Sequence, residues 1–257
     1  KDWFPEPENF EQYVYYSQLM QAEGMATGIL AHREAKPWCM GSLYWQLNDC
    51  WPAVSWSSVD YYGERKALHY KAREVFEPVI ATVNYKGNVA ELTLINDDPT
   101  IEQIGLFFQL IDHRGQEVYG AYYPDFSAPY NRNSTIRVTI PEEVMGAYKE
   151  NKLLTRITLS TDYSFISQRI ILPDKPKNII FEKPEVRQKI EKQGDGFRIT
   201  LWADAFVYGM YLTAPGIKGQ FSDNFFNIVP GKLAIITFTP ETKMEALDVK
   251  YMYYQKD

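Results

Sequence analysis

The sequence predicts a mainly β fold with an α/β piece at its N-terminal end. Within residues 1–77, apolar residues recur at helical spacing on either side of one short apolar run. Beyond Pro78, short β-rich runs alternate with turn residues, which is typical of antiparallel sandwiches. The chain has 257 residues. Because domains usually hold about 100–200 residues, we expect two domains and an additional piece.

A long helix is expected from about Glu8 to Glu34. This segment contains no proline, whereas Pro5 and Pro7 precede it and Pro37 follows it, as expected at the ends of a helix. One stripe of the helix is expected to face the core. Its members follow helical spacing: Phe10, Val14, Ser17, Met20, Gly24, Met25 and Gly28.

A buried parallel strand is expected next, at residues 40–47. This run is nearly continuous in apolar residues and does not alternate, so both of its faces must be covered, as in an α/β sheet or barrel. A loop rich in Trp, Ser and Asp follows at residues 48–63. Helix, strand, loop and helix form one α/β unit, which places a domain boundary near Glu77. The second helical face comprises Ala67, Leu68, Ala72, Val75 and Phe76.

Two immunoglobulin-like β-sandwich domains are expected in the rest of the chain, at residues 78–173 and 174–257. Many short strands separated by turn signals indicate this architecture. A proline-containing linker at residues 173–177 separates the two groups of strands. The expected strands are residues 89–95, 106–111, 135–140 and 153–159, then 197–202, 207–212, 234–238 and 247–253.

Composition and spacing exclude several classes of function. The formal net charge is −6 and no long Lys/Arg run occurs, which argues against contact with nucleic acid or an anionic membrane surface. No stretch approaches the roughly 18 apolar residues needed to cross a bilayer. We therefore expect no cofactor, no metal and no membrane partner. The residues that lack the spacing of a zinc site or a disulfide framework are Cys39, Cys50, His32, His69 and His113.

Candidate binding residues lie where the expected strand ends. In a β/α barrel, the residues that leave the C-terminal ends of the strands line the active site. Here that exit carries Trp45, Asn48 and Asp49. A pyranose presents a C–H face to aromatic rings and hydroxyl groups to amides and carboxylates, so these side chains fit a sugar subsite. From composition alone, a sugar site and a packed aromatic loop stay equally open.

A resemblance adds to this interpretation. Residues 40–49, 51–52, 55–58, 60–63 and 66–70, which include Tyr-Trp-Gln-Leu-Asn-Asp, look like the end of the barrel in glycoside hydrolase family 2 β-mannosidases. Residues 221–226 and 230–231 are similar to the C-terminal sandwich of the same enzymes. The resemblance implies that residues 1–77 supply the last strand and helices of a TIM (β/α)8 barrel, followed by the two sandwiches.

The same resemblance implies retaining hydrolysis of terminal, non-reducing β-D-mannose residues in an oligosaccharide or glycoconjugate. Such enzymes use two glutamates whose carboxyl groups lie about 5–5.5 Å apart. Both family glutamates lie on earlier barrel strands, so neither maps onto this chain, and we expect the isolated chain to be inactive. Trp45 matches the tryptophan that packs against the sugar in the −1 subsite. Asn48 and Asp49 can each brace the loop or touch substrate.

Other prominent residues are given structural interpretations. Trp51 and Trp56 are expected to pack, and Asp223-Asn224 is expected to shape a turn. Glutamates on the expected helices are interpreted as solvated surface and receive no catalytic role: Glu11, Glu23, Glu34, Glu64 and Glu74.

The partners follow from the incomplete barrel unit. A lone barrel strand leaves backbone edges and apolar faces open, so residues 1–76 are expected to pack on the sandwiches, on another copy of the chain, or on a missing N-terminal part of the same protein. The resemblance implies an extracytoplasmic location, whether periplasmic, secreted or lysosomal. Two alternatives stay open. One is a family 2 exo-β-glucosaminidase, and the other is a carbohydrate-binding or adhesion module with an exposed aromatic row on a sandwich face.

Overall fold

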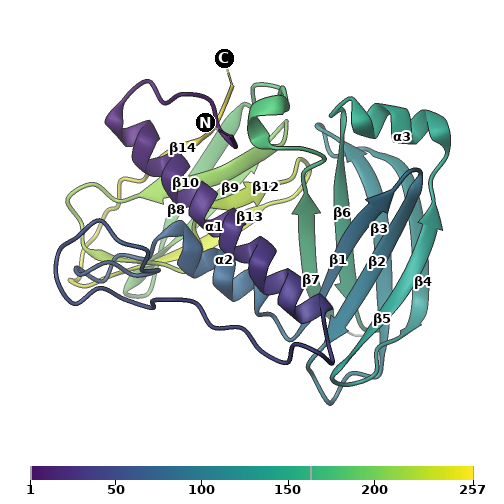
Figure 1. The fold of residues 1–257 in the computed structure, drawn as a ribbon. Helices are drawn as coiled ribbons and strands as arrows, with labels where there is room; N and C mark the ends of the chain where they lie inside the picture. Colours follow the sequence, from purple (N-terminus) through teal and green to yellow (C-terminus); the bar gives the residue numbers. More distant parts are fainter. Residues whose placement is uncertain (1, 163, 257) are drawn as a thin grey trace.

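The computed structural model describes residues 2–162 and 164–256 and shows a mainly β fold with helices at the N-terminal end. Helix α1 (Phe10–Glu34) crosses in front of the C-terminal half of the molecule, and α2 (Ala67–Val75) lies below it (Figure 1). Asn9 caps α1 by accepting a hydrogen bond from the backbone N–H of Gln12 at 2.9 Å. Both helices that the sequence predicts are confirmed.

The stripe predicted to bury α1 is wrong. Phe10 is 79% exposed, and Val14, Met20, Gly24 and Gly28 are also exposed. Helix α1 has apolar residues on two faces, and in the part of the chain that the structure describes only one of these faces meets a partner. The residues buried there are Tyr15, Leu19, Ala22, Ala26, Ile29 and Arg33.

Two antiparallel sheets enclose the first β core, with strand orders β1-β2-β5 and β4-β3-β6-β7. Alternate residues of β3, such as Leu106, Phe108 and Leu110, point into this core, and helix α3 (Glu142–Lys149) packs against it through Met145 and Tyr148. The strands are β1 (Val79–Lys86), β2 (Val89–Asn96), β3 (Gln103–Asp112), β4 (Glu117–Ser127), β5 (Arg132–Thr139), β6 (Leu153–Ser160) and β7 (Phe165–Ile171).

Two further antiparallel sheets, β11-β13-β9-β8 and β12-β10-β14, enclose the second β core. Ile199, Leu201, Met210, Leu212 and Phe238 are among its buried residues. A short 3-10 turn, η1 (Pro176–Asn178), connects the two pairs of sheets at the predicted linker. The strands are β8 (Val186–Gln193), β9 (Gly196–Ala203), β10 (Val207–Thr213), β11 (Gly219–Phe221), β12 (Phe226–Ile228), β13 (Ala234–Pro240) and β14 (Lys250–Tyr254).

All eight predicted β segments coincide wholly or partly with strands: β2, β3, β5, β6, β9, β10, β13 and β14. The strands that were not predicted are β1, β4, β7, β8, β11 and β12. Strands β4 and β8 lie at sheet edges and carry many exposed residues, and β11 and β12 have three residues each, so their hydrophobic pattern is weak.

A third core joins the helices to both pairs of sheets. It contains Leu19 of α1, Ile111 and Leu154 of the first pair, and Phe181 and Phe206 near the second. Tyr15 donates its hydroxyl proton to the carbonyl oxygen of Gly209 at 2.5 Å. The expectation that residues 1–76 pack on the sandwiches is therefore confirmed for the two helices. Among the described residues, no helix is long and apolar enough to span a bilayer.

Candidate functional site

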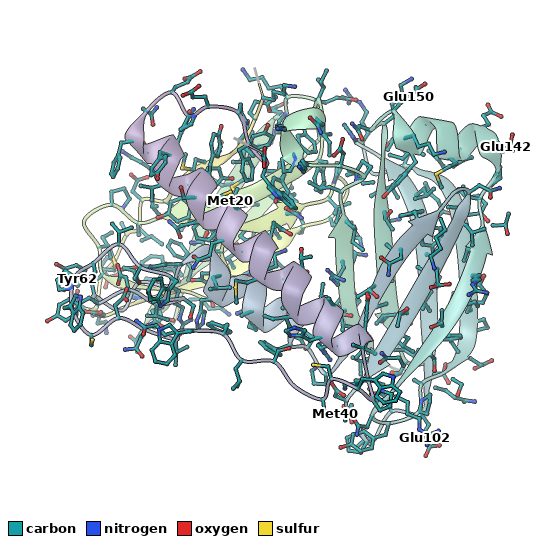
Figure 2. The ribbon with its side chains drawn as sticks, in the orientation of Figure 1. Met20, Met40, Tyr62, Glu102, Glu142 and Glu150 are labelled. Carbon is teal, nitrogen blue, oxygen red and sulfur yellow. The ribbon has the colours of Figure 1, made fainter. Side chains whose placement is uncertain are left out.

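The segment between the two helices lies outside the three cores. It leaves the C-terminal end of α1, runs along the lower edge of the molecule and returns to α2, with Met40 and Tyr62 labelled along its path (Figures 1 and 2). The buried parallel strand predicted at residues 40–47 is wrong, because this stretch has no strand and Leu43 is fully exposed. A parallel strand needs backbone partners along its length, whereas within the described residues only Gln46 and Leu47 of this stretch have backbone hydrogen-bond partners, at Ser58 and Val59 of the loop.

Trp45 emerges from this segment with its side chain in solvent. The residue is 74% exposed, and the peptide bond between Trp45 and Gln46 is cis. Trp38, Trp51 and Trp56 are also exposed, so packing roles for Trp51 and Trp56 within the described residues are not observed. The indole of Trp45 therefore belongs to a solvent-facing aromatic segment and not to a sandwich core.

The carboxylate of Asp49 organises the loop. Ser55 donates a hydrogen bond to its Oδ1 and Ser57 to its Oδ2, both at 2.6 Å, and Lys66 Nζ lies 3.5 Å from Oδ2. Gln46 adds a weaker contact of 3.3 Å to Oδ1. The hydrogen bonds from Ser55 and Ser57 lower the pKa of Asp49 below its ordinary value. Asp49 thus braces the loop, one of the two roles that the sequence left open.

Backbone hydrogen bonds complete this frame. The N–H of Val59 donates to Leu47 O at 2.8 Å, and the N–H of Lys66 donates to Ser58 O at 2.9 Å. Gln21 of α1 donates from Nε2 to Trp56 O at 2.8 Å, which ties the loop to the helix. The loop therefore has a defined path although it forms only isolated β-bridges, at Asn48–Val59 and Val59–Arg65.

The three predicted site residues separate into two groups. Trp45 and Asn48 are exposed, and the Asn48 amide donates to Asp49 O at 3.2 Å, whereas Asp49 is buried. An exposed indole beside an amide can bind a sugar ring through its C–H face and hydroxyl groups. The sequence analysis missed the supporting Ser55, Ser57 and Lys66, although two serines downstream of a lone Asp are a recognisable signal for such a network.

Two of the helix glutamates take part in an ion-pair cluster. Glu23 and Glu74 were interpreted as solvated surface, but both contact Lys71 Nζ, at 3.3 and 2.9 Å. Glu74 also pairs with Arg169 Nε of β7 at 3.2 Å, so this cluster joins α1 and α2 to the first pair of sheets. No group of three or more potential metal-ligating His, Cys, Asp or Glu side chains occurs in residues 2–162 and 164–256.

The second motif singled out in the sequence shapes a turn, as predicted. Asn224 Oδ1 accepts from the N–H of Leu212 at 2.7 Å, and Asn224 Nδ2 donates to the carbonyl of the same residue at 2.9 Å. Asp223 receives a hydrogen bond from Arg73 of α2 at 2.7 Å. The motif therefore also joins the second pair of sheets to the helices.

Sequence comparisons agree with this arrangement. The mannosidase Ig-fold domain family matches residues 171–252, which begin at the end of β7 and contain most of the second pair of sheets. β-Mannosidase A of Neosartorya fischeri is 25% identical over 252 residues, which cover 91% of this chain and 27% of that protein. The β-mannosidase of Capra hircus is 28% identical over 247 residues, covering 90% of this chain and 28% of that protein.

This chain is similar to the C-terminal Ig-fold region of β-mannosidases. It spans less than a third of the length of the relatives described above. The crystal structure of β-D-mannosidase from Dictyoglomus thermophilum superposes with a TM-score of 0.83 at 23% identity and covers 99% of this chain and 31% of that one. The exo-chitosanase of Amycolatopsis orientalis gives a TM-score of 0.69 at 14% identity, over 96% of this chain and 34% of that one. At these identities the two structures show a shared fold.

Proposed function

We propose that this chain is the C-terminal portion of a retaining exo-β-mannosidase of glycoside hydrolase family 2. The complete enzyme hydrolyses terminal, non-reducing β-D-mannose residues in oligosaccharides or glycoconjugates. Residues 1–77 then form the end of the catalytic (β/α)8 barrel, and residues 78–173 and 174–257 form two immunoglobulin-like sandwiches. The relatives support this proposal because their similarity extends over about nine tenths of the chain.

The exposed indole of Trp45 is the observation that carries the proposal. Trp45 lies on a loop that Asp49 holds in place through hydrogen bonds with Ser55 and Ser57. The backbone that carries the indole therefore has a defined conformation. A flat apolar face with a neighbouring amide, Asn48, suits the C–H face and hydroxyl groups of a hexose. In this proposal Trp45 is the platform under the terminal mannose, Asn48 is a polar contact, and Asp49 positions both through the loop.

The exposed face of α1 and residues 40–47 belong together in this proposal. Leu43 and Leu47 are exposed, as are Phe10 and Met20 on the helix. When neighbouring barrel strands are present, residues 40–47 gain backbone partners on both sides and become the last parallel strand. The exposed residues of α1 from Met20 to Gly28 then pack on that sheet, while Phe10, Tyr13 and Val14 at the start of the helix face the loop and the second pair of sheets.

The chain alone is proposed to be inactive. Retaining hydrolysis needs two carboxyl groups about 5–5.5 Å apart, one as nucleophile and one as acid/base. Glu23 and Glu74 both form ion pairs with Lys71, and Glu74 also pairs with Arg169, at the junction with the sheets. Both catalytic carboxylates are therefore assigned to other strands of the complete barrel.

Substitution of Trp45 tests the proposal in a longer protein that contains this region. We expect Trp45→Ala to lower kcat/KM for an aryl β-D-mannoside by about tenfold or more, equivalent to at least about 1.4 kcal/mol of lost transition-state binding. Trp38→Ala is the matched control, because Trp38 is also exposed but precedes the matching segment. Equal activity of the two variants, or a parent enzyme that prefers the aryl β-D-glucosaminide, would refute the assignment.

A further inference from the structure

A cleft of about 730 Å³ lies between α1, the end of the loop and the second pair of sheets. Tyr13 lines it from the helix, Glu64 and Arg65 line it from the loop, and Tyr211 and Phe225 line it from the sheets. Its volume falls within the roughly 300–1,000 Å³ of pockets that bury small ligands. Ser55 and Lys66, which contact Asp49, line the cleft, but Trp45, Asn48 and Asp49 do not, so the cleft adjoins the site proposed above without including its candidate binding residues.

Aromatic rings stand on two sides of the cleft. Tyr211 and Phe225 stack with their ring centroids 4.5 Å apart and form one wall. Phe10 and Tyr13 stack near the start of α1 with centroids 6.3 Å apart, and Tyr13 is 56% exposed. Aromatic rings that line a cleft offer apolar surface to the C–H faces of sugar rings.

The charges of the cleft cancel. Its charged lining residues are Asp60, Glu64, Arg65 and Lys66, two acidic and two basic side chains. A cleft without net charge gives no electrostatic preference to a phosphorylated, acidic or strongly basic ligand. Its composition therefore favours a neutral, polar ligand.

Several polar side chains that line the cleft are available to form hydrogen bonds with a ligand. Asp60 Oδ1 already accepts from the backbone N–H groups of Tyr62 and Glu64, and Lys66 Nζ donates to Ser57 Oγ at 2.8 Å. By contrast, the side chains of Glu64, Arg65 and Gln220 make no hydrogen bond or ion pair within residues 2–162 and 164–256. These three side chains offer both donors and acceptors around the aromatic walls, which is the combination that hydroxyl groups require.

We propose that this cleft is a second saccharide-binding site, which accepts a neutral oligosaccharide segment of about two pyranose rings. The aromatic walls bind the ring faces, and Glu64, Arg65 and Gln220 bind hydroxyl groups. Binding here needs no catalytic carboxylates, so the 257-residue chain is sufficient for it. The choice of a ligand with the manno configuration rests on the proposed function. The assignment of the cleft as a saccharide-binding site does not.

Titration of the purified chain with β-1,4-mannobiose, followed by calorimetry and saturation-transfer NMR, tests this site. We expect saturable binding that Tyr13→Ala weakens by about tenfold or more. Tyr130→Ala is the matched control, because Tyr130 is also 56% exposed but lies in the loop between β4 and β5, outside the cleft. Trp38→Ala is a second control that should leave binding unchanged, because Trp38 is exposed and does not line the cleft.

Three outcomes would overturn the proposal when circular dichroism shows that the variants are folded. They are the absence of binding by any neutral disaccharide, an equal loss in Tyr13→Ala and Tyr130→Ala, and a loss in Trp38→Ala alone. If cellobiose binds as tightly as mannobiose and Tyr13→Ala weakens both, the saccharide site is supported and its manno specificity is not. Turnover of an aryl β-mannoside by the longer protein tests the proposed function separately.

Discussion

The junction of α1 with the sheets and the loop at residues 38–62 have similar aromatic content but opposite environments. At the junction, Tyr15, Phe181 and Phe206 are buried together with residues from both pairs of sheets. Along the loop, Trp45 and Trp51 stand in solvent on a backbone that polar side chains brace. The sequence pattern of their apolar residues did not show which of the two regions is buried.

This difference shows which contacts the chain completes by itself. At the junction, apolar side chains are buried against helices and strands of the same chain, and Glu74 is paired with Lys71 and Arg169. The loop satisfies its own polar groups around Asp49 but leaves its aromatic groups open. Large exposed apolar patches mark binding surfaces, which is the physical reason for proposing a binding site on the loop.

The largest expected effect is on stability, from Phe206→Ala. Phe206 is 1% exposed in the third core, which joins the helices to both pairs of sheets. Its truncation leaves a cavity and should lower the free energy of unfolding by about 3–5 kcal/mol. Trp45→Ala in the same chain should change the free energy of unfolding by no more than about 0.5 kcal/mol, because the indole is exposed and its truncation removes little buried surface. Urea denaturation measures both values. A large loss in Trp45→Ala would show that the loop is part of the folded core.

A smaller effect is expected from Glu74→Gln, as a change in pH dependence. Burial alone raises the pKa of Glu74, but Lys71 and Arg169 outweigh it and lower the pKa to about 2. A depressed pKa stabilises the fold above the ordinary value near 4.5, and this contribution is lost as the pH falls toward 2. Thermal unfolding from pH 7 to 2 should therefore show a shallower acid loss in Glu74→Gln. Glu143→Gln on α3 is the control, and parallel curves for all three proteins would contradict the cluster's role.

The smallest effect on overall stability is expected from Asp49→Asn, which should act within the loop. The amide cannot accept hydrogen bonds from both Ser55 and Ser57 and lacks the charge that faces Lys66. Hydrogen exchange should become faster at the amides of Ser58 and Val59, while exchange in β3 and β9 stays the same. Unchanged exchange in the loop would show that Asp49 does not brace it.

Sequence patterns predicted elements whose partners lie within the chain. Strands β3 and β9 were identified because their apolar residues are buried by strands of the same sheets and by the facing sheet. Helix α1 was predicted with correct ends, but the wrong face was chosen because the helix has two apolar faces and periodicity does not show which one finds a partner. The strand prediction for residues 40–47 was wrong for a related reason. Their apolar run predicts a strand with both faces buried, and no element of this chain covers those faces within the described residues.

The contacts within the candidate site could not be predicted from the sequence, and its role in binding sugar stays a prediction. Trp45 and Asn48 were identified from residue type and place along the chain, and both reach solvent. The role of Asp49 depended on how the loop folds back, because Ser55 and Ser57 meet its carboxylate only when the chain turns. The cleft between α1 and the second pair of sheets was not predicted, because its walls come from segments about 200 residues apart along the chain, such as Tyr13 and Tyr211.

Turnover of an aryl β-D-mannoside tests the central claim, that this chain folds around complete cores but presents only part of a catalytic site. The purified 257-residue chain is compared with a longer protein that contains the other barrel strands. We predict that the chain is folded by circular dichroism and has no activity above background, whereas the longer protein releases the aryl group at a measurable rate. Measurable turnover by the 257-residue chain, or none by the longer folded protein, would contradict this account.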